Sequence, residues 1–141
     1  MNIKHLLSIT ADLRNLAAIR HHVEETAITL GIDAGTICDL LLAVDEAVCN
    51  IILHGHKGKP ESIEIEIEHG GDRLIIRLRD NAPPFDPTRI PPPDLTLPLE
   101  QRAVGGLGIH LMRQVMDEVH HRILPQGGNE LTLVKRLAVN Q

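Results

Sequence analysis

Residues 61–80 read ESIEIEIEHGGDRLIIRLRD, and this stretch decides the fold. Isoleucine and glutamate alternate through residues 63–68, so apolar side chains point to one face of a strand and acidic side chains to the other. Residues 70–72, Gly-Gly-Asp, are a turn sequence. Residues 73–80 alternate again, with leucine or isoleucine at every second position. The stretch therefore predicts a β-hairpin with one face packed on a core and one face in water.

The patterns on either side of this hairpin complete the expected order of elements. Gly31 suits a helix stop and Asp33 a helix cap. The expected bounds are strand 3–10, a helix from Thr10 or Asp12 to Leu30, helix 34–54, the hairpin, a proline-rich loop over 81–104, helix 106–117, and strands 119–124 and 131–137. This order favours an α+β fold in a single domain over residues 1–141, with three helices on one face of a mostly antiparallel mixed sheet.

Composition excludes several classes of function. The chain has one Phe and no Trp or Tyr, so the core must be aliphatic, and base stacking on single-stranded nucleic acid is disfavoured. The net charge of -5 argues against a general nucleic-acid or acidic-membrane binder. No apolar run approaches the roughly 20 residues of a membrane span, and the N-terminus lacks the apolar segment of a signal peptide. We expect a cytoplasmic protein.

The two cysteines, Cys38 and Cys49, fall in one expected helix. They lie about 16 Å apart along its axis, which is too far for a disulfide. We expect them to be small buried thiols in a reducing compartment.

A polar pair interrupts the otherwise apolar helix of residues 34–54. Glu46 and Asn50 are four residues apart, so their side chains project from one face about one turn apart. An amide oxygen can ligate Mg²⁺, which prefers hard oxygen donors, and a nearby carboxylate can act as general base for a water or a hydroxyl. The same pair also suits the solvated face of an ordinary amphipathic helix.

Asp80 follows an apolar strand and precedes Asn81-Ala82-Pro83-Pro84. It can be a plain strand-ending turn residue. It can equally be a carboxylate at the floor of a pocket, accepting a hydrogen bond from an exocyclic amine such as that of adenine. Phe85, the single aromatic residue, is better explained as an apolar anchor for the loop base than as a stacking platform.

The proline-rich loop is too long for a passive connection in so small a chain, and long loops of this kind are usually lids or binding loops. Gly105-Gly106-Leu107-Gly108 then opens the third helix. Glycines at a helix start let backbone N–H groups approach an anion, although a tight loop-to-helix junction also needs small residues. Arg102 precedes the glycines and suits either solvent or a phosphate.

In this order, these segments resemble the GHKL-type ATP-binding domains of bacterial anti-sigma factor serine kinases, over nearly the whole chain. Residues 46–54 look like that family's N box. Residues 80–86 look like its first glycine box, in a Pro-Pro-Phe-Asp variant, and residues 105–109 look like its second. The resemblance implies the two-layer α/β sandwich called the Bergerat fold, with an ATP lid at about residues 83–105. Thr132 falls where the family has a threonine near the adenine.

The resemblance also implies roles for single residues. Glu46 would be the catalytic base, and Asn50 would hold Mg²⁺. The implied nucleotide-binding residues are Asn50, Asp80, Ala82, Phe85, Arg102, Gly105, Gly106, Leu107, Gly108, Ile109 and Thr132. Ala82 stands where the family usually has glycine. Alanine lacks the freedom of positive φ but is still small, so this departure concerns affinity more than identity.

The function that the resemblance implies is an ATP- and Mg²⁺-dependent serine/threonine-protein kinase acting as an anti-sigma factor or related partner-switching regulator. Its substrate would be a STAS-domain antagonist. A sigma factor and a second copy of the chain are further partners that the resemblance admits, whereas nucleic acid and membrane are not expected. The alternative is a nucleotide-gated binding module without kinase activity.

Overall fold

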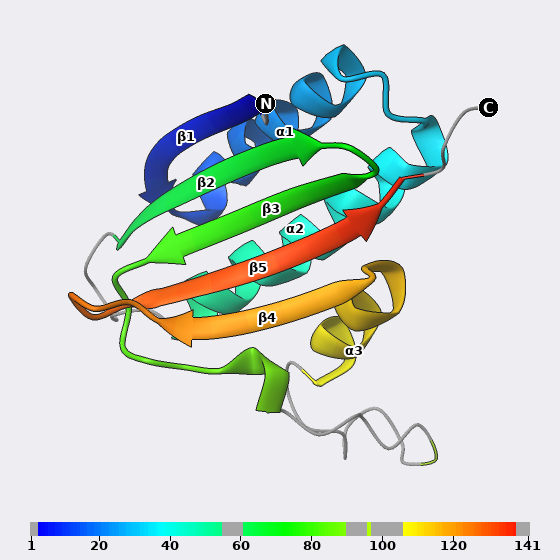
Figure 1. Cartoon of the computed structure of the whole chain (residues 1–141). Coiled ribbons are helices and arrows are strands. Elements are labelled where there is room, and N and C mark those ends of the chain that lie inside the picture. The colour runs from blue at the N-terminus through cyan, green and yellow to red at the C-terminus, as the bar shows by residue number, and fades with distance from the viewer. Residues whose placement is uncertain (1–2, 55–60, 90–95, 97–105, 138–141) are drawn as a thin grey trace.

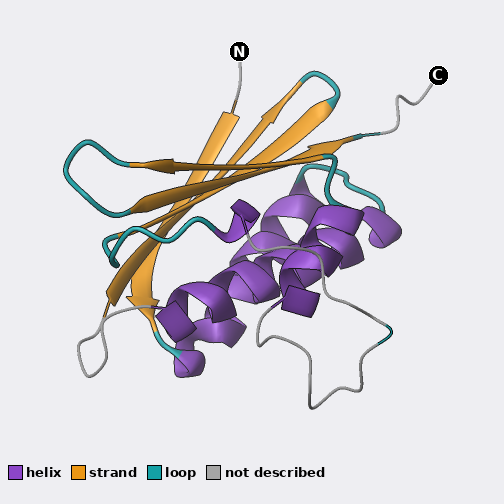
Figure 2. Ribbon diagram, turned by 90° about the horizontal axis from the view of Figure 1, so that it is seen from below, coloured by secondary structure: helices purple, strands orange, loops and turns teal. Residues whose placement is uncertain are grey.

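The computed structural model describes residues 3–54, 61–89, 96 and 106–137. A five-stranded sheet is covered on one face by helices, which Figures 1 and 2 show from two directions. The elements are β1 (Ile3–Ala11), a 3₁₀ turn (Leu13–Asn15), α1 (Leu16–Thr29), α2 (Ala34–His54), β2 (Glu61–Gly70), β3 (Arg73–Asp80), a second 3₁₀ turn (Pro87–Arg89), α3 (Gly106–Val115), β4 (Glu118–Ile123) and β5 (Asn129–Arg136). The expected α+β architecture is confirmed.

The strand order is β1-β2-β3-β5-β4, and each neighbouring pair in it is antiparallel. The sheet that these strands form is thus antiparallel throughout, where a mostly antiparallel mixed sheet was expected. The connection from β3 to β4 carries α3. It places β4 at the edge of the sheet, and β5 then returns between β4 and β3 and pairs with both. This arrangement brings the end of β3 beside the start of β5.

The β2–β3 hairpin supplies the centre of the core, as its alternating pattern predicts. Opposed residues such as Ile65 and Leu78 face the helices, and their side chains are at most 1% exposed. The six apolar side chains of the hairpin on this face are Ile63, Ile65, Ile67, Leu74, Ile76 and Leu78. Removing side chains of this size from water is worth about 1.5–3 kcal/mol each, so the hairpin accounts for much of the stability of the core.

The opposite face of the sheet carries a ladder of ion pairs. Arg77 donates hydrogen bonds to Glu66 (2.7 Å) and Glu68 (3.0 Å), and Arg79 donates to Glu64 and Glu130 (2.7 Å each). Both carboxylates that bind Arg77 are on β2, whereas Arg79 joins β2 to β5. This face was predicted to be in water, but its side chains are partly buried by these charge-assisted hydrogen bonds.

The helix boundaries follow from their caps. Asp33 accepts hydrogen bonds from the backbone N–H and the hydroxyl of Thr36, which caps the N-terminus of α2. Gly31 has φ +78° and ends α1, while the N–H of Ile32 reaches back to the carbonyl of Ala27. The N–H of Gly31 also donates to the carbonyl of Ile28, and these two bonds with the left-handed glycine form a Schellman motif. Both helix ends are as the sequence predicts.

The expectation that Cys38 and Cys49 are buried was wrong. Both are exposed, because they lie on a side of α2 that contacts neither the sheet nor the described helices. Partial loss of water around the thiol, with the negative charges of Glu46 and Asp45 close by, nevertheless raises the pKa of Cys49. The thiolate is therefore disfavoured, and Cys49 is a poor nucleophile despite its exposure.

Candidate nucleotide-binding site

A cavity opens where the C-terminal half of α2, the end of β3 and the start of β5 meet. It takes in about 350 Å³, counted to its open mouth. Its walls are Ala47, Asn50 and Ile51 of α2, Asp80, Ala82, Pro83, Phe85 and Pro87 of β3 and the following loop, His121 of β4, and Asn129 and Leu131 of β5. A largely apolar hollow with a few convergent polar groups is the usual form of a small-molecule site.

Asp80 is one of the polar residues that line this cavity. It ends β3 on the same face as Leu78, so it is buried, where a strand-ending acid is ordinarily exposed. Its Oδ1 accepts hydrogen bonds from the backbone N–H of Ala82 (2.9 Å) and from Nδ2 of Asn129 (3.0 Å). Asp80 therefore does both things that the sequence left open: it caps the turn into the loop and it lines a pocket.

Asn129 is a site residue that the sequence analysis missed. Its Nδ2 donates to Asp80 and to the carbonyl of Pro83 (3.2 Å), while its Oδ1 accepts from the N–H of Phe85 (2.9 Å) and contacts Nε2 of His121 (2.8 Å). The buried amide of Asn129 thus provides hydrogen-bond partners for several polar groups of the turn after β3. The sequence signal was the Gly127-Gly128 pair before it, which sets where the strand begins.

Ala82 stands where the family that the chain resembles usually has glycine, and it causes no backbone strain. No described residue other than glycine has a positive φ, so the backbone at Ala82 is open to any L-amino acid. Its side chain is buried in the cavity wall. The substitution therefore narrows the cavity by one methyl group and leaves the turn intact.

Gly128, in contrast, cannot be replaced so simply. It has φ +91°, and a Cβ atom there would collide with the carbonyl oxygen of Asp80 and stand 3.0 Å from Cα of Asn81. The β4–β5 hairpin can pack against the end of β3 only because residue 128 has no side chain.

Glu46 and Asn50 are on α2, one turn apart as predicted, but they have different surroundings. Asn50 lines the cavity. A Cβ atom on Gly108 would collide with Oε2 of Glu46, so the carboxylate fills the space beside the third residue of α3. The helix dipole favours a negative charge at this turn. Asp45, the neighbour of Glu46, turns instead to α1, where it pairs with Arg20.

Two predicted nucleotide contacts are not brought to the cavity. Thr132 lies on the opposite face of the sheet, because β5 turns Leu131 and Leu133 to the core and Thr132 pairs with Arg77, which belongs to the charged face. Its prediction as a residue near the adenine was wrong. Ile109 is buried in the hydrophobic core, so its side chain is not available to a ligand in the cavity.

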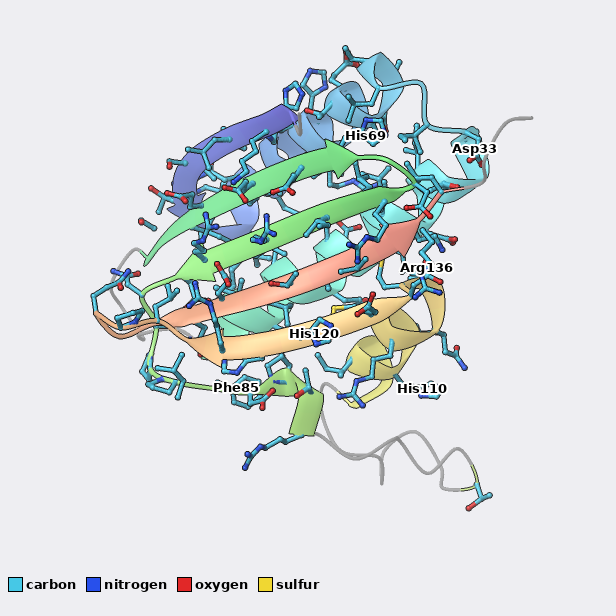
Figure 3. The ribbon with its side chains drawn as sticks, viewed as in Figure 1. Asp33, His69, Phe85, His110, His120 and Arg136 are labelled. Atoms are coloured by element: carbon cyan, nitrogen blue, oxygen red, sulfur yellow. The ribbon has the colours of Figure 1, made fainter. Side chains whose placement is uncertain are left out.

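The remaining predicted residues belong to the expected lid or to the start of α3. Gly106 and Leu107 are the first two residues of α3. Arg102, Gly105 and most of the expected lid, residues 83–105, lie outside the described residues. The loop base is described: Phe85 is half-buried beside β4 (Figure 3), and its backbone is held by Asn129. The interpretation of Phe85 as an anchor for the loop base agrees with this position.

The donor set of the cavity fits Mg²⁺ bound together with phosphates. Mg²⁺ takes one or two protein oxygens and completes its shell with water and phosphate oxygens, and Asn50 offers an amide at the cavity wall. Across the described ranges, no cluster of three or more His, Cys, Asp or Glu side chains is arranged to hold a metal by itself. No helix within these ranges is long and apolar enough to cross a bilayer.

Comparisons with known proteins agree with this geometry. A family model described as histidine kinase-like ATPase domain matches residues 9–135. Relatives named serine-protein kinase RsbW, from Bacillus cereus (strain Q1) and Bacillus thuringiensis subsp. konkukian (strain 97-27), are each 29% identical over 139 residues, covering 96% of this chain and 86% of the relative. The resemblance to bacterial serine kinases is thereby confirmed.

One solved structure has the same fold. The RsbU and RsbW domains of Rv1364c from Mycobacterium tuberculosis match with a TM-score of 0.68 at 17% identity. The match covers 96% of this chain and 32% of that chain. At this identity the likeness concerns the fold alone.

Proposed function

The chain belongs to the family of histidine kinase-like ATPase domains, and from this premise we propose that it is an ATP- and Mg²⁺-dependent serine/threonine-protein kinase. It acts as an anti-sigma factor or a related partner-switching regulator. The observation that carries the proposal is the buried Asp80, fixed by Ala82 and Asn129 at a cavity that Asn50 also lines.

Adenine recognition rests on Asp80. An ionised carboxylate only accepts hydrogen bonds, and its Oδ1 already takes two of them from the protein. The carboxylate is thus held rigid while it lines a largely apolar cavity. A planar base with an exocyclic amine matches a fixed acceptor beside apolar walls.

The phosphates are expected to run from the cavity towards α3. The first turn of α3 presents backbone N–H groups, and glycine at 106 and 108 lets an anion approach them. Asn50 would hold Mg²⁺ through its amide oxygen. When bound, the ion neutralises charge on the β- and γ-phosphates.

Glu46 is proposed as the general base. It would take the proton from the serine or threonine hydroxyl as that oxygen attacks the γ-phosphorus. A new P–O bond to the substrate forms, the bond to the β,γ-bridging oxygen breaks, and ADP leaves with that oxygen. The position of Glu46 beside the first turn of α3 supports this role, because the transferred phosphoryl group would be held at the same turn.

The proposed partners follow from the same family membership. We propose a STAS-domain protein as phosphoacceptor, and a sigma factor and a second copy of the chain as further binding partners. A reaction between ATP and a regulator of transcription would take place in the cytoplasm. Residues 83–105 are proposed as the ATP lid, with Arg102 and Gly105 contacting phosphate.

The alternative is a nucleotide-gated binding module. It is favoured by one observation: Glu46 is not among the cavity-lining residues and already occupies the space at Gly108. In that case ATP and ADP would change partner affinity without phosphoryl transfer.

The test is transfer of radiolabelled phosphate from [γ-³²P]ATP to a STAS-domain protein encoded beside this chain. The kinase proposal predicts transfer by the wild type and none above background by Glu46→Gln, with ATP binding retained in both. Glu25→Gln, an exposed acid on α1, is the matched control. Undiminished transfer by Glu46→Gln would refute its role as base. ATP binding with no transfer by the wild type would favour the module.

A further inference from the structure

His121 of β4 is a cavity residue to which neither the sequence motifs nor the proposed reaction gives a role. Its side chain is 5% exposed. The segment after β3 runs beside β4 (Figure 1), and the imidazole lies between this segment and the start of β5. Its neighbour His120 faces the other way, is 63% exposed, and pairs with Glu118.

The hydrogen-bond network fixes which ring nitrogen of His121 carries a proton. Nδ2 of Asn129 points to the carboxylate of Asp80, so the amide oxygen must be the atom that faces Phe85 and His121. An amide oxygen only accepts. Nε2 of His121 therefore donates to it, over 2.8 Å, and the second nitrogen, Nδ1, carries no proton when the ring is neutral.

Nδ1 faces the carboxylate of Asp86, with 3.7 Å between Nδ1 and Oδ1. This separation exceeds hydrogen-bond range, as expected for two lone pairs that face each other. Protonation of Nδ1 would turn the contact into a charge-assisted hydrogen bond. Asp86 in turn accepts hydrogen bonds from the N–H (2.9 Å) and hydroxyl (2.5 Å) of Thr88, so it is rigidly attached to the segment that it belongs to.

Other charged groups around the ring do not compete for it. Nε of Arg89 lies 3.5 Å from Oδ2 of Asp86, whereas His121 faces the other carboxylate oxygen, Oδ1. Arg113 of α3 donates to the carbonyl of Thr88, and Asp80 is separated from the ring by Asn129. Burial acts to raise the pKa of Asp86, but the Thr88 hydrogen bonds, His121 and Arg89 outweigh it and lower the pKa. Asp86 is thus ionised and ready to pair.

We propose that His121 is a positioning residue that clamps residues 82–89 onto the sheet through Asn129 and Asp86, and that the clamp sets the nucleotide affinity of the cavity. The segment carries Ala82, Phe85 and Pro87 in the cavity wall, so a loosened clamp opens the base end of the site. A protonated ring closes the clamp more firmly than a neutral one. This inference rests on the proposed nucleotide site and adds to it a proton-linked control of affinity.

Four variants separate the contacts. His121→Leu puts an apolar side chain at this position and removes both contacts. His121→Gln keeps an amide donor for Asn129 but cannot become charged. Asp86→Asn leaves the ring intact and removes its charged partner, and His120→Gln is the matched control on the same strand.

The experiment measures Mg²⁺–ATP affinity by calorimetry between about pH 8 and about pH 6. Phosphoryl transfer is measured in parallel. We expect His121→Leu to weaken binding about tenfold while kcat stays unchanged, and His121→Gln to recover most of that loss. The wild type and His120→Gln should bind more tightly as the pH falls. That trend should be absent in His121→Gln and Asp86→Asn.

Amide hydrogen exchange of residues 82–89 without nucleotide tests the clamp by itself. Exchange should be faster in His121→Leu than in the wild type and unchanged in His120→Gln. Equal exchange and equal ATP affinity in His121→Leu and the wild type would overturn the inference. Exchange could be faster in His121→Leu, as expected, while the wild type binds no ATP. That result would support the clamp but refute both the proposed function and the control of nucleotide affinity.

Discussion

Asp80 and Asn129 occupy opposed positions in the antiparallel pair of β3 and β5, and a 3.0 Å hydrogen bond joins their side chains. Both side chains are buried. Two strand ends that are distant in sequence thus bring together polar residues of the cavity wall. Each contact between them can be tested by a separate substitution.

Asn129→Ala should weaken both the fold and the site. The change leaves Asp80, the N–H of Phe85 and Nε2 of His121 without their shared partner, which costs about 1–3 kcal/mol of unfolding free energy. ATP affinity should fall as well, because Asp80 loses one of its two fixing hydrogen bonds. Urea unfolding and calorimetry measure the two effects. Asn81→Ala, at an exposed neighbouring position, should stay within about 0.5 kcal/mol of the wild type.

Gly128→Ala and Gly127→Ala form a matched pair. Both positions have φ near +90°, but a Cβ atom on Gly127 meets nothing within 4 Å, whereas one on Gly128 collides with Asp80. Gly127→Ala should cost about 1–2 kcal/mol for the left-handed backbone, and Gly128→Ala roughly 3 kcal/mol or more because the strand ends must move apart. Equal urea midpoints for the two variants would contradict the close approach.

Gly108→Ala should reduce phosphoryl transfer more than stability. The added methyl group displaces the end of a flexible glutamate side chain, not backbone, so the unfolding free energy should change by less than about 1 kcal/mol. Transfer should fall because Glu46 no longer lies at the first turn of α3. Transfer by Gly108→Ala at the wild-type rate would show that the position of Glu46 beside the first turn of α3 does not matter for the reaction.

His22 should make stability depend on pH. Burial, together with the nearby His5, lowers the pKa of His22 below its ordinary 6.5, and the Nε2 atoms of both rings are buried without a hydrogen-bond partner in the described part of the chain. The unfolded state therefore binds a proton more readily than the folded state. Stability is complete above the unfolded pKa and decreases as the pH falls through 6.5 towards the folded pKa.

His22→Leu should remove this dependence without removing the packing of α1 against β1. Chemical unfolding at several pH values between 7.5 and 5.5, around that ordinary histidine value, measures it. His21→Leu, at the exposed adjacent position, should retain the wild-type slope. A slope that survives in His22→Leu would assign the dependence to another group.

The elements of the fold were predictable because their signals are local. The alternation of residues 61–80 gave the hairpin and its buried face, and Asp33 and Gly31 marked helix ends that the structure places at the same residues. The cysteines were predicted wrongly because an apolar helix pattern does not reveal which side of α2 is left uncovered.

The cavity was predictable only in part, for a reason of register. Asn129 becomes a site residue because the β4–β5 turn begins β5 two residues earlier than the apolar pattern suggests, opposite Asp80. The period of two then turns Asn129 and Leu131 to the cavity and Thr132 away from it. The apolar residues Leu131 and Leu133 already indicate which face of β5 is buried. The pairing of Asn129 with Asp80, however, depends on the geometry of the turn and on Gly128.

The ion-pair ladder on the open face of the sheet also limits how a phosphoacceptor protein can approach. Arg77 and Arg79 are each held by two or more carboxylates of the same chain. A partner that docked there would have to strip water from these groups and offer better counter-charges, which is rarely favourable. The serine of the proposed phosphoacceptor should therefore approach from the side of α2 and α3, because the paired charges make the open face of the sheet a poor binding surface.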